Sequence, residues 1–166
     1  AQVTNPPIDA LREKIVTDTT VYVGSDGNLL SDKPENCAVL AINNPILSSV
    51  DLMKIRGMDI PGFKVRTVSL LYGTNEKLGD ALERLFAECD RAHDEEGVNV
   101  IILSDRGVDE NHVAIPSLLA VSAMEQHLIR VKKRTAVSII LESAEPRDVH
   151  HFAALLGYGA RAVNPY

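Results

Sequence analysis

From about residue 65 onwards, short apolar runs alternate along the chain with longer segments that have helical periodicity. A short run without polar alternation is typical of a strand that is buried on both faces. The runs are residues 98–103, 136–141 and 160–163, and residues 65–72 are predicted to be a strand from their β-branched and aromatic content. The helical segments between them are residues 75–96, 115–134 and 146–156. This β-α-β-α-β-α-β order predicts parallel strands joined by right-handed crossovers.

The first helical segment shows the periodic pattern most clearly. Its apolar residues recur at the i, i+3, i+4, i+7 spacing of one helix face. They are Leu78, Ala81, Leu82, Leu85, Phe86 and Cys89. Gly97 is well placed to end this helix. The second helix is basic at its C-terminal end, as the helix dipole favours, and Pro146 suits the first turn of the third.

Residues 1–64 are less regular and carry five of the eight prolines. Here we expect a helix over residues 8–16, capped by Thr4 or Asn5, a strand over 19–23 and a helix over 48–55. The chain is thus predicted to be one unit, with an irregular part (1–64) followed by a βα part (65–166). The predicted fold is α/β, with parallel βα units forming a partial or rudimentary (β/α) barrel. An open doubly wound sheet fits the periodicity equally well.

Composition excludes several classes of protein. The formal charge of −6 and the low aromatic content of 4% argue against nucleic-acid binding. No apolar run approaches the roughly 20 residues that span a bilayer, and no signal segment opens the chain, so we expect no membrane association. Cys37 and Cys89 are predicted to be reduced thiols of a cytosolic protein. The chain starts at Ala1 and stops just after an apolar run, so we expect a fragment of a longer protein.

Polar residues follow the ends of three predicted strands, where chemistry sits in parallel α/β folds. They are Ser104 to Gly107, Glu142 with Ser143, and Asn164. One interpretation is a ligand pocket. The other, which we favour, is loop closure, in which Asp105 pairs with Arg106 and Ser143 caps the next helix.

Other motifs carry less weight. A triad of Ser104, His150 and Asp105 is possible on paper, but no G-x-S-x-G motif accompanies it. The match of residues 157–162 to G-x-G-x-x-A lies between a helix and a strand, the reverse of the dinucleotide-binding order. The glycines of 57–62 lack the lysine of a phosphate-binding loop. The neighbouring His150 and His151 would point about 100° apart on a helix, which disfavours a shared metal. The acidic cluster Asp90, Asp94, Glu95 and Glu96 is predicted to be a solvated helix end.

Several longer stretches resemble the later part of the central domain of the large chain of glutamate synthase. They are residues 1–9, 27–30, 101–108, 115–120 and 149–166, and together they span the chain. The resemblance is looser over 31–77. It also departs at Glu125-Gln126, where relatives often have neighbouring histidines.

The resemblance implies a parent enzyme that makes glutamate from glutamine and 2-oxoglutarate, with electrons from a pyridine nucleotide or ferredoxin. In that family an amidotransferase domain releases ammonia and an FMN-binding barrel with an iron–sulfur cluster reduces the imino acid. The central domain lies between them, and ammonia passes internally. The implied partners of this chain are those two domains. The implied location is the cytoplasm, or the plastid stroma for a plant parent.

The residues of this segment also indicate that it lacks the reactive groups of the parent enzyme. Residue 1 is Ala, the cysteine spacing of an iron–sulfur cluster is absent, and no FMN phosphate loop is found. We therefore expect no catalytic, cofactor-binding or metal-binding residue here, and a role as a scaffold. The resemblance suggests that Thr4 and Asn5 lie near the ammonia route and line it; the alternative is that Asn5 only caps a helix. Two other functions stay open, a barrel-like flavin-binding enzyme with a site at Asp105, Arg106, Glu142 and His150, and a binding module.

Overall fold

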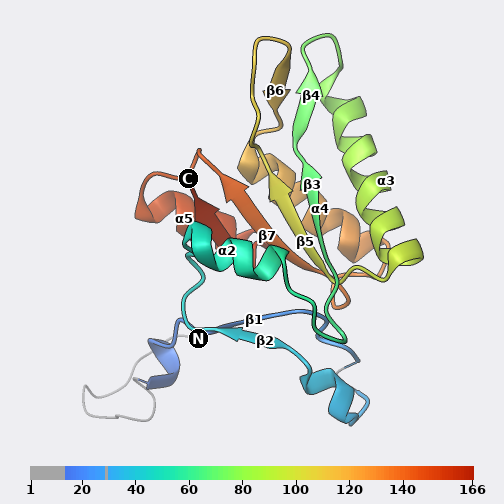
Figure 1. Ribbon diagram of the computed structural model, residues 1–166, viewed down its shortest axis with the longest axis vertical. Coiled ribbons are helices and arrows are strands. Elements are labelled where there is room, and N and C mark those ends of the chain that lie inside the picture. The colour runs from blue at the N-terminus through green and yellow to red at the C-terminus, as the bar shows by residue number, and fades with distance from the viewer. Residues whose placement is uncertain (1–13, 29) are drawn as a thin grey trace.

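The computed structural model describes residues 14–28 and 30–166 and shows a mixed α/β fold (Figure 1). Its centre is a four-stranded parallel sheet in the order β3-β5-β7-β8. The strands are β3 (Val65–Ser69), β5 (Val100–Ser104), β7 (Ser138–Ser143) and β8 (Ala162–Pro165). The connecting helices are α3 (Leu78–Glu96), α4 (Ser117–Arg130) and α5 (Val149–Gly157). The predicted alternation and the parallel pairing are confirmed.

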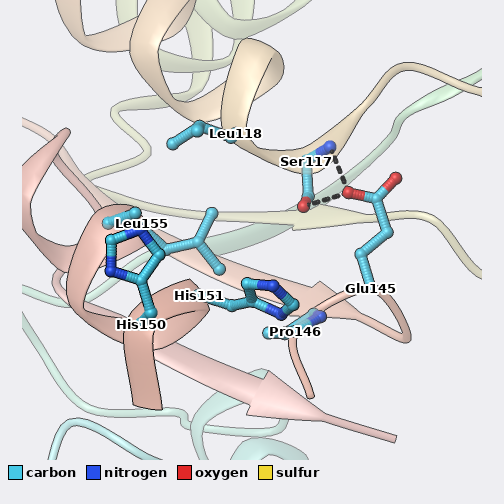
Figure 2. A pocket seen from close by; sticks show the side chains of 8 residues that line it. Ser117, Leu118, Glu145, Pro146, His150, His151 and Leu155 are labelled. Carbon is cyan, nitrogen blue, oxygen red and sulfur yellow. Dashed lines mark hydrogen bonds between the residues drawn. The ribbon is translucent and has the colours of Figure 1, made fainter. Parts of the chain in front are cut away.

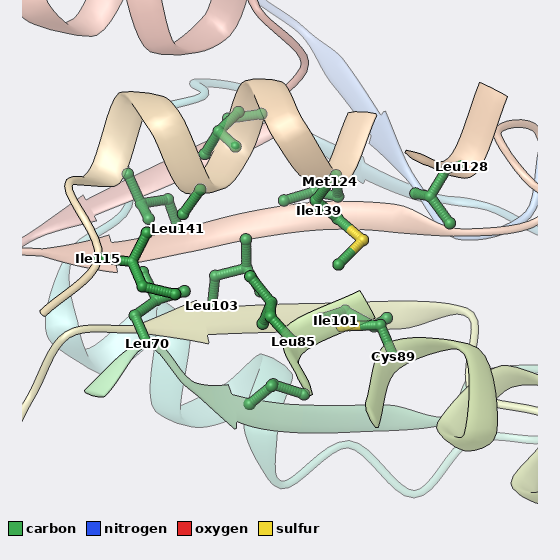
Figure 3. Packing of buried hydrophobic residues seen from close by; sticks show 14 of the residues in the cluster. Leu70, Leu85, Cys89, Ile101, Leu103, Ile115, Met124, Leu128, Ile139 and Leu141 are labelled. Atoms are coloured by element: carbon green, nitrogen blue, oxygen red, sulfur yellow. The ribbon is translucent and has the colours of Figure 1, made fainter. Parts of the chain in front are cut away.

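The three connecting helices pack on one face of the sheet and form the larger core (Figure 3). The periodic residues of α3, including Leu85 and Cys89, contact the sheet there. Met124 and Leu128 of α4 join the same core. Because alternate residues of each central strand point to this face, one half of every apolar run is buried under the helices.

The opposite face of the sheet is covered by the N-terminal part of the chain. Helix α2 (Ser49–Arg56) lies over it, beside a ribbon of β1 (Val21–Val23) and β2 (Leu40–Ile42). Buried side chains from both sides form a second core: Val23, Leu47, Leu52, Ile55, Val100, Ile102, Ile140 and Ala162. The predicted helix over 48–55 is confirmed, and Ser48 caps it in a reciprocal pair with Asp51.

The N-terminal part is also joined to the sheet by backbone hydrogen bonds. The amide of Leu47 donates to Val163 O at 2.8 Å, and the amide of Val163 donates to Pro45 O at 2.7 Å. Beyond the carboxyl ends of β3 and β5, β4 (Leu71–Gly73) and β6 (His112–Ala114) form an antiparallel ribbon (Figure 1). This ribbon and the short 3-10 helix Pro34–Cys37 were not predicted, because such short elements carry little periodicity.

Some predicted boundaries were wrong. The second helix ends at Arg130 rather than Arg134, because Lys132 adopts a left-handed backbone with φ of 63°. The third helix begins at Val149 rather than Pro146, with Asp148 as its cap. The predicted end of the first helix at Gly97 is confirmed, with φ of 71°.

Other predictions meet the structure only in part. Residues 14–16 are helical, and the rest of the helix predicted over 8–16 lies outside the described residues. Both cysteines are free, with Cys37 exposed and Cys89 buried. The parallel sheet is shown, whereas closure into a barrel stays a prediction. None of the helices within the described residues is long and apolar enough to cross a bilayer.

Candidate functional site

The strand register brings four polar side chains into one row at the carboxyl edge of the sheet. Ser69 lies opposite Ser104, which lies opposite Glu142, which lies opposite Asn164. Ile102, Ile140 and Ala162 lie two positions before Ser104, Glu142 and Asn164 and belong to the core beneath α2. Because residues two apart in a strand point to the same face, the polar row faces the α2 side. The sheet thus ends in a polar row above an apolar layer. Ser104, Glu142 and Asn164 were predicted from the sequence to follow strand ends. Their alignment with Ser69 in one row results from the parallel strand register.

Glu142 is the centre of this row and is only 3% exposed. Its Oε2 accepts hydrogen bonds from Ser104 Oγ at 2.6 Å and from a terminal nitrogen of Arg56 at 2.8 Å. Its Oε1 accepts from Arg106 Nε at 2.6 Å. Arg56 comes from the last turn of α2 and also donates to Thr67 Oγ1 at 3.2 Å. One buried carboxylate therefore joins α2, β5 and the loop after β5.

The surroundings of Glu142 keep it ionised. Burial by itself raises the pKa of this carboxyl, but hydrogen bonds from Ser104 and Arg106 and the charge of Arg56 outweigh burial, so the pKa is lower than the ordinary value. The same hydrogen bond to Glu142 raises the pKa of Arg106. A carboxylate held in this way is a poor proton donor or acceptor near neutral pH.

Asp105 is occupied by a second set of partners. Its Oδ2 accepts from Ser143 Oγ at 2.6 Å, and its Oδ1 accepts from Tyr166 Oη at 2.5 Å. Burial and this hydrogen bond raise the pKa of Tyr166 to about 12. The guanidinium of Arg106 lies over the Tyr166 ring, 3.7 Å from its centre, in a cation–π contact. The tyrosine thus joins the two sets.

These contacts correct two predictions. Asp105 does not pair with Arg106, because Arg106 turns to the buried Glu142 while Asp105 takes hydroxyl donors. Ser143 does not cap α5, since its hydroxyl donates to Asp105, and Asp148 caps that helix. Loop closure, the favoured interpretation of these polar residues, is compatible with the geometry, but the partners differ from those predicted.

Sequence reasoning missed Arg56 and Tyr166 and did not foresee the role of Asn164. Arg56 lies 86 residues from Glu142, and no local pattern links the two. Asn164 is fully buried, and its Nδ2 donates to Leu47 O at 2.8 Å, which ties β8 to the segment before α2. Its Oδ1 has no hydrogen-bond partner in the structure.

His150 belongs to a different hollow, shown in Figure 2. This pocket of about 240 Å³ lies between the start of α4 and α5 and is lined by Ser117, Leu118, Glu145, Pro146, His150, His151, Ala154 and Leu155. The backbone amide and hydroxyl of Ser117 both donate to Glu145. Ser104 donates to Glu142, and Asp105 accepts from Ser143 and Tyr166. The structure therefore does not form the catalytic triad of Ser104, His150 and Asp105 that the sequence allowed.

The acidic cluster at the end of α3 is more structured than predicted. Lys133 Nζ lies 2.8 Å from Asp90 Oδ1 and 2.7 Å from Asp94 Oδ2. Asp90 also contacts His127 Nε2 at 2.7 Å, and the His127 ring stacks on Phe86 with centroids 4.5 Å apart. Burial tends to raise the pKa of Asp90, but the bonds from Lys133 and His127 leave it lower than usual. These pairs tie α3 to α4 and the turn after it.

The geometry indicates a fixed assembly at the strand ends. The carboxylates of Glu142 and Asp105 are each shared among several donors, and the Tyr166 phenol stays protonated near neutral pH. No cluster of three potential metal ligands occurs among residues 14–28 and 30–166. Thr4 and Asn5, the candidate tunnel residues, lie outside the described residues.

The fold and this site define a class of protein, a parallel βα domain whose strand ends are joined by a buried carboxylate held between two arginines. Comparison with known families places the chain more narrowly. The family model described as the glutamate synthase central domain matches residues 1–166. The chain therefore belongs to the glutamate synthase central domain family, which confirms the resemblance seen in the sequence.

Individual relatives agree with the family match, and each is aligned over the whole of this chain. The glutamate synthase [NADPH] large chain of Bacillus subtilis is 46% identical over 166 residues. The glutamate synthase [NADH] of Schizosaccharomyces pombe is 39% identical over 171 residues, and the ferredoxin-dependent glutamate synthase 2 of Synechocystis is 39% identical over 170. The chain spans 11%, 8% and 11% of the lengths of these three proteins.

Proposed function

We propose that this chain is the connecting central domain of a glutamate synthase large chain. In this role it holds an amidotransferase domain and an FMN-binding domain at a fixed separation. The parent enzyme makes glutamate from glutamine and 2-oxoglutarate and uses FMN and an iron–sulfur cluster outside this segment. The observation that carries the proposal is the family match over residues 1–166.

The carboxyl edge of the sheet supports a positioning role. Its ionisable groups are bound to one another, and they come from α2, β7, the loop after β5 and the residue after β8. Such cross-links stiffen the edge of the sheet at the side where parallel α/β domains meet ligands and neighbours. A stiff spacer supports catalysis elsewhere, because internal transfer of ammonia depends on a constant distance between two centres.

The proposal includes a contribution to ammonia channelling through Thr4 and Asn5. Small polar side chains line a path for ammonia without trapping it as a strongly acidic group would. The location follows the parent, in the cytoplasm or, for a plant enzyme, the plastid stroma. The electron donor stays open, since the relatives include proteins named for NADPH, NADH and ferredoxin.

Coupling in the parent enzyme tests the channelling role. Asn5→Leu is expected to lower the glutamate formed per glutamine hydrolysed, because an apolar side chain obstructs a polar path. Asn5→Ser, which keeps a small polar group, is the matched control and is expected to stay close to the parent ratio. Glutaminase and synthase rates are measured in the same reaction. An unchanged ratio in the leucine variant would remove Asn5 from the route.

The competing function, a barrel-like flavin-binding enzyme, has a separate test. An absorbance spectrum of the purified 166-residue chain reports bound flavin directly. Flavin at one equivalent per chain would favour that alternative over a connecting domain. A spectrum without flavin, together with glutamine-dependent glutamate formation by the parent, supports the connecting role.

A further inference from the structure

The outward side of α4 and α5 is unusually apolar for a solvent-facing helix pair. In helix α5, which has the sequence VHHFAALLG, Leu155 is buried, and Phe152 and Leu156 are partly buried against the larger core. Leu118, Leu119 and Ile129 of α4 are exposed, as are Val149 of α5 and Tyr158 just after it. Surface helices of a soluble domain normally turn a polar face outwards. An apolar outer face of this kind marks a surface that contacts another part of a protein.

A groove of about 700 Å³ lies between α4 and the C-terminal end of α5 with the turn after it. Its lining residues on α4 extend from Leu119 to Ile129, a length of about 15 Å, or nearly three helical turns. The lining includes the small residues Ser122, Ala123, Gly157 and Gly159. Small side chains let a third backbone approach closely, and the exposed apolar side chains beside them supply contact area.

The groove also contains an incompletely satisfied carboxylate. Glu125 is 15% exposed, and one of its oxygens forms an ion pair with Arg134. Its other oxygen, Oε2, is buried and has no hydrogen-bond partner in the structure. A Cβ atom on Gly159 would lie 2.7 Å from this oxygen, so the glycine leaves room for the carboxylate. This oxygen is already covered by the domain itself, so it does not present an acceptor at the surface of the groove.

Two basic residues that follow the lining residue Ile129 along the chain indicate the character of the occupant. Arg130 and Lys132 are exposed where α4 ends, in a chain whose formal charge is −6. A segment docked here is favoured if it carries acidic residues at that end. The curated relatives extend far beyond the aligned region, which is 8–11% of their lengths, so other domains of one polypeptide are the available source.

We propose that the α4–α5 groove is a docking site for an amphipathic helix from another domain of the same, longer polypeptide. That helix presents an apolar stripe to the groove and acidic residues to Arg130 and Lys132. This inference rests on the proposed function, which supplies the longer polypeptide. It adds the surface by which the connecting domain meets a neighbour.

Side-chain oxidation by hydroxyl radicals, measured by mass spectrometry on the full-length parent, tests the groove. Tyr158 and Tyr22 are 59% and 53% exposed, so they should be oxidised at similar rates if both faces are free. A docked helix should slow the oxidation of Tyr158 at least about fivefold relative to Tyr22. Ser122→Arg places a long charged side chain in the groove and should restore the oxidation of Tyr158. Ala87→Arg, at an exposed position of α3, is the matched control and should leave it slow.

The outcomes separate the groove from the proposed function. Equal oxidation of the two tyrosines in the parent would overturn the docking site, even where the parent synthesises glutamate from glutamine. Protection of Tyr158 that disappears when dimers dissociate on dilution would assign the groove to a second copy and overturn the proposed occupant. A parent that forms no glutamate from glutamine would instead contradict the proposed function. If Ser122→Arg does not fold, the oxidation rates of Tyr158 and Tyr22 in the wild-type parent still test whether the groove is occupied.

Discussion

Replacing Glu142 by Gln tests whether the carboxylate at the strand ends stabilises the fold. The substitution preserves size and the acceptor for Ser104, but it removes the charge that faces Arg56 and Arg106. Removing one partner of a fully buried ion pair costs about 3–5 kcal/mol. The two guanidiniums here are 39% and 48% exposed, so water recovers part of that loss. We expect the free energy of unfolding to fall by about 2 kcal/mol.

For a chain of 166 residues, this loss corresponds to a Tm about 4–8 °C lower. Urea unfolding followed by circular dichroism measures the free energy, with Glu83→Gln at an exposed position of α3 as the control. A loss below about 0.5 kcal/mol, the range of ordinary surface substitutions, would refute the reasoning that this pair is stabilising.

The same variant gives a pH signature. Folding lowers the pKa of Glu142 from its ordinary value of 4.5, so its stabilising contribution is fully present above that pH. The contribution is lost as the pH falls through the lower pKa of the folded state. The difference in unfolding free energy between wild type and Glu142→Gln should therefore be constant from about pH 6 to 8 and shrink below about pH 4.5. A difference that grows in acid would contradict the assigned direction of the shift.

Three further predictions use the same chain. Gly159→Ala should lower the unfolding free energy by about 1–3 kcal/mol, because φ is +126° and the new Cβ would meet Glu125; urea unfolding measures it. Leu103→Ala should cost about 2–5 kcal/mol in the same assay, since Leu103 is completely buried in the larger core. The exposed Cys37 should react with a thiol reagent in the native state. Cys89, whose burial raises its pKa to about 12, should react only on unfolding, and equal native rates would contradict its placement.

Part of the candidate site could be predicted from the sequence. Asp105 and Glu142 were expected at strand ends because each follows or ends an apolar run, and the structure places them at the carboxyl edge. Their partners could not be predicted. Arg56 belongs to a different part of the chain, and Tyr166 reaches Asp105 only after β8 has entered the sheet.

The sequence by itself determined the order and type of the four strands of the parallel sheet and of the three helices that connect them. Helical periodicity and apolar runs depend on which faces of an element are buried, and both are patterns of neighbouring residues. They can therefore be recognised in the sequence before the fold is known. Only the tertiary structure decided which charges meet. Glu142 takes Arg56 from 86 residues away, and Asp90 takes Lys133 from 43 residues away. Such pairs depend on strand register and helix packing, because a charge has no preferred sequence separation and binds whichever opposite charge the fold brings within reach.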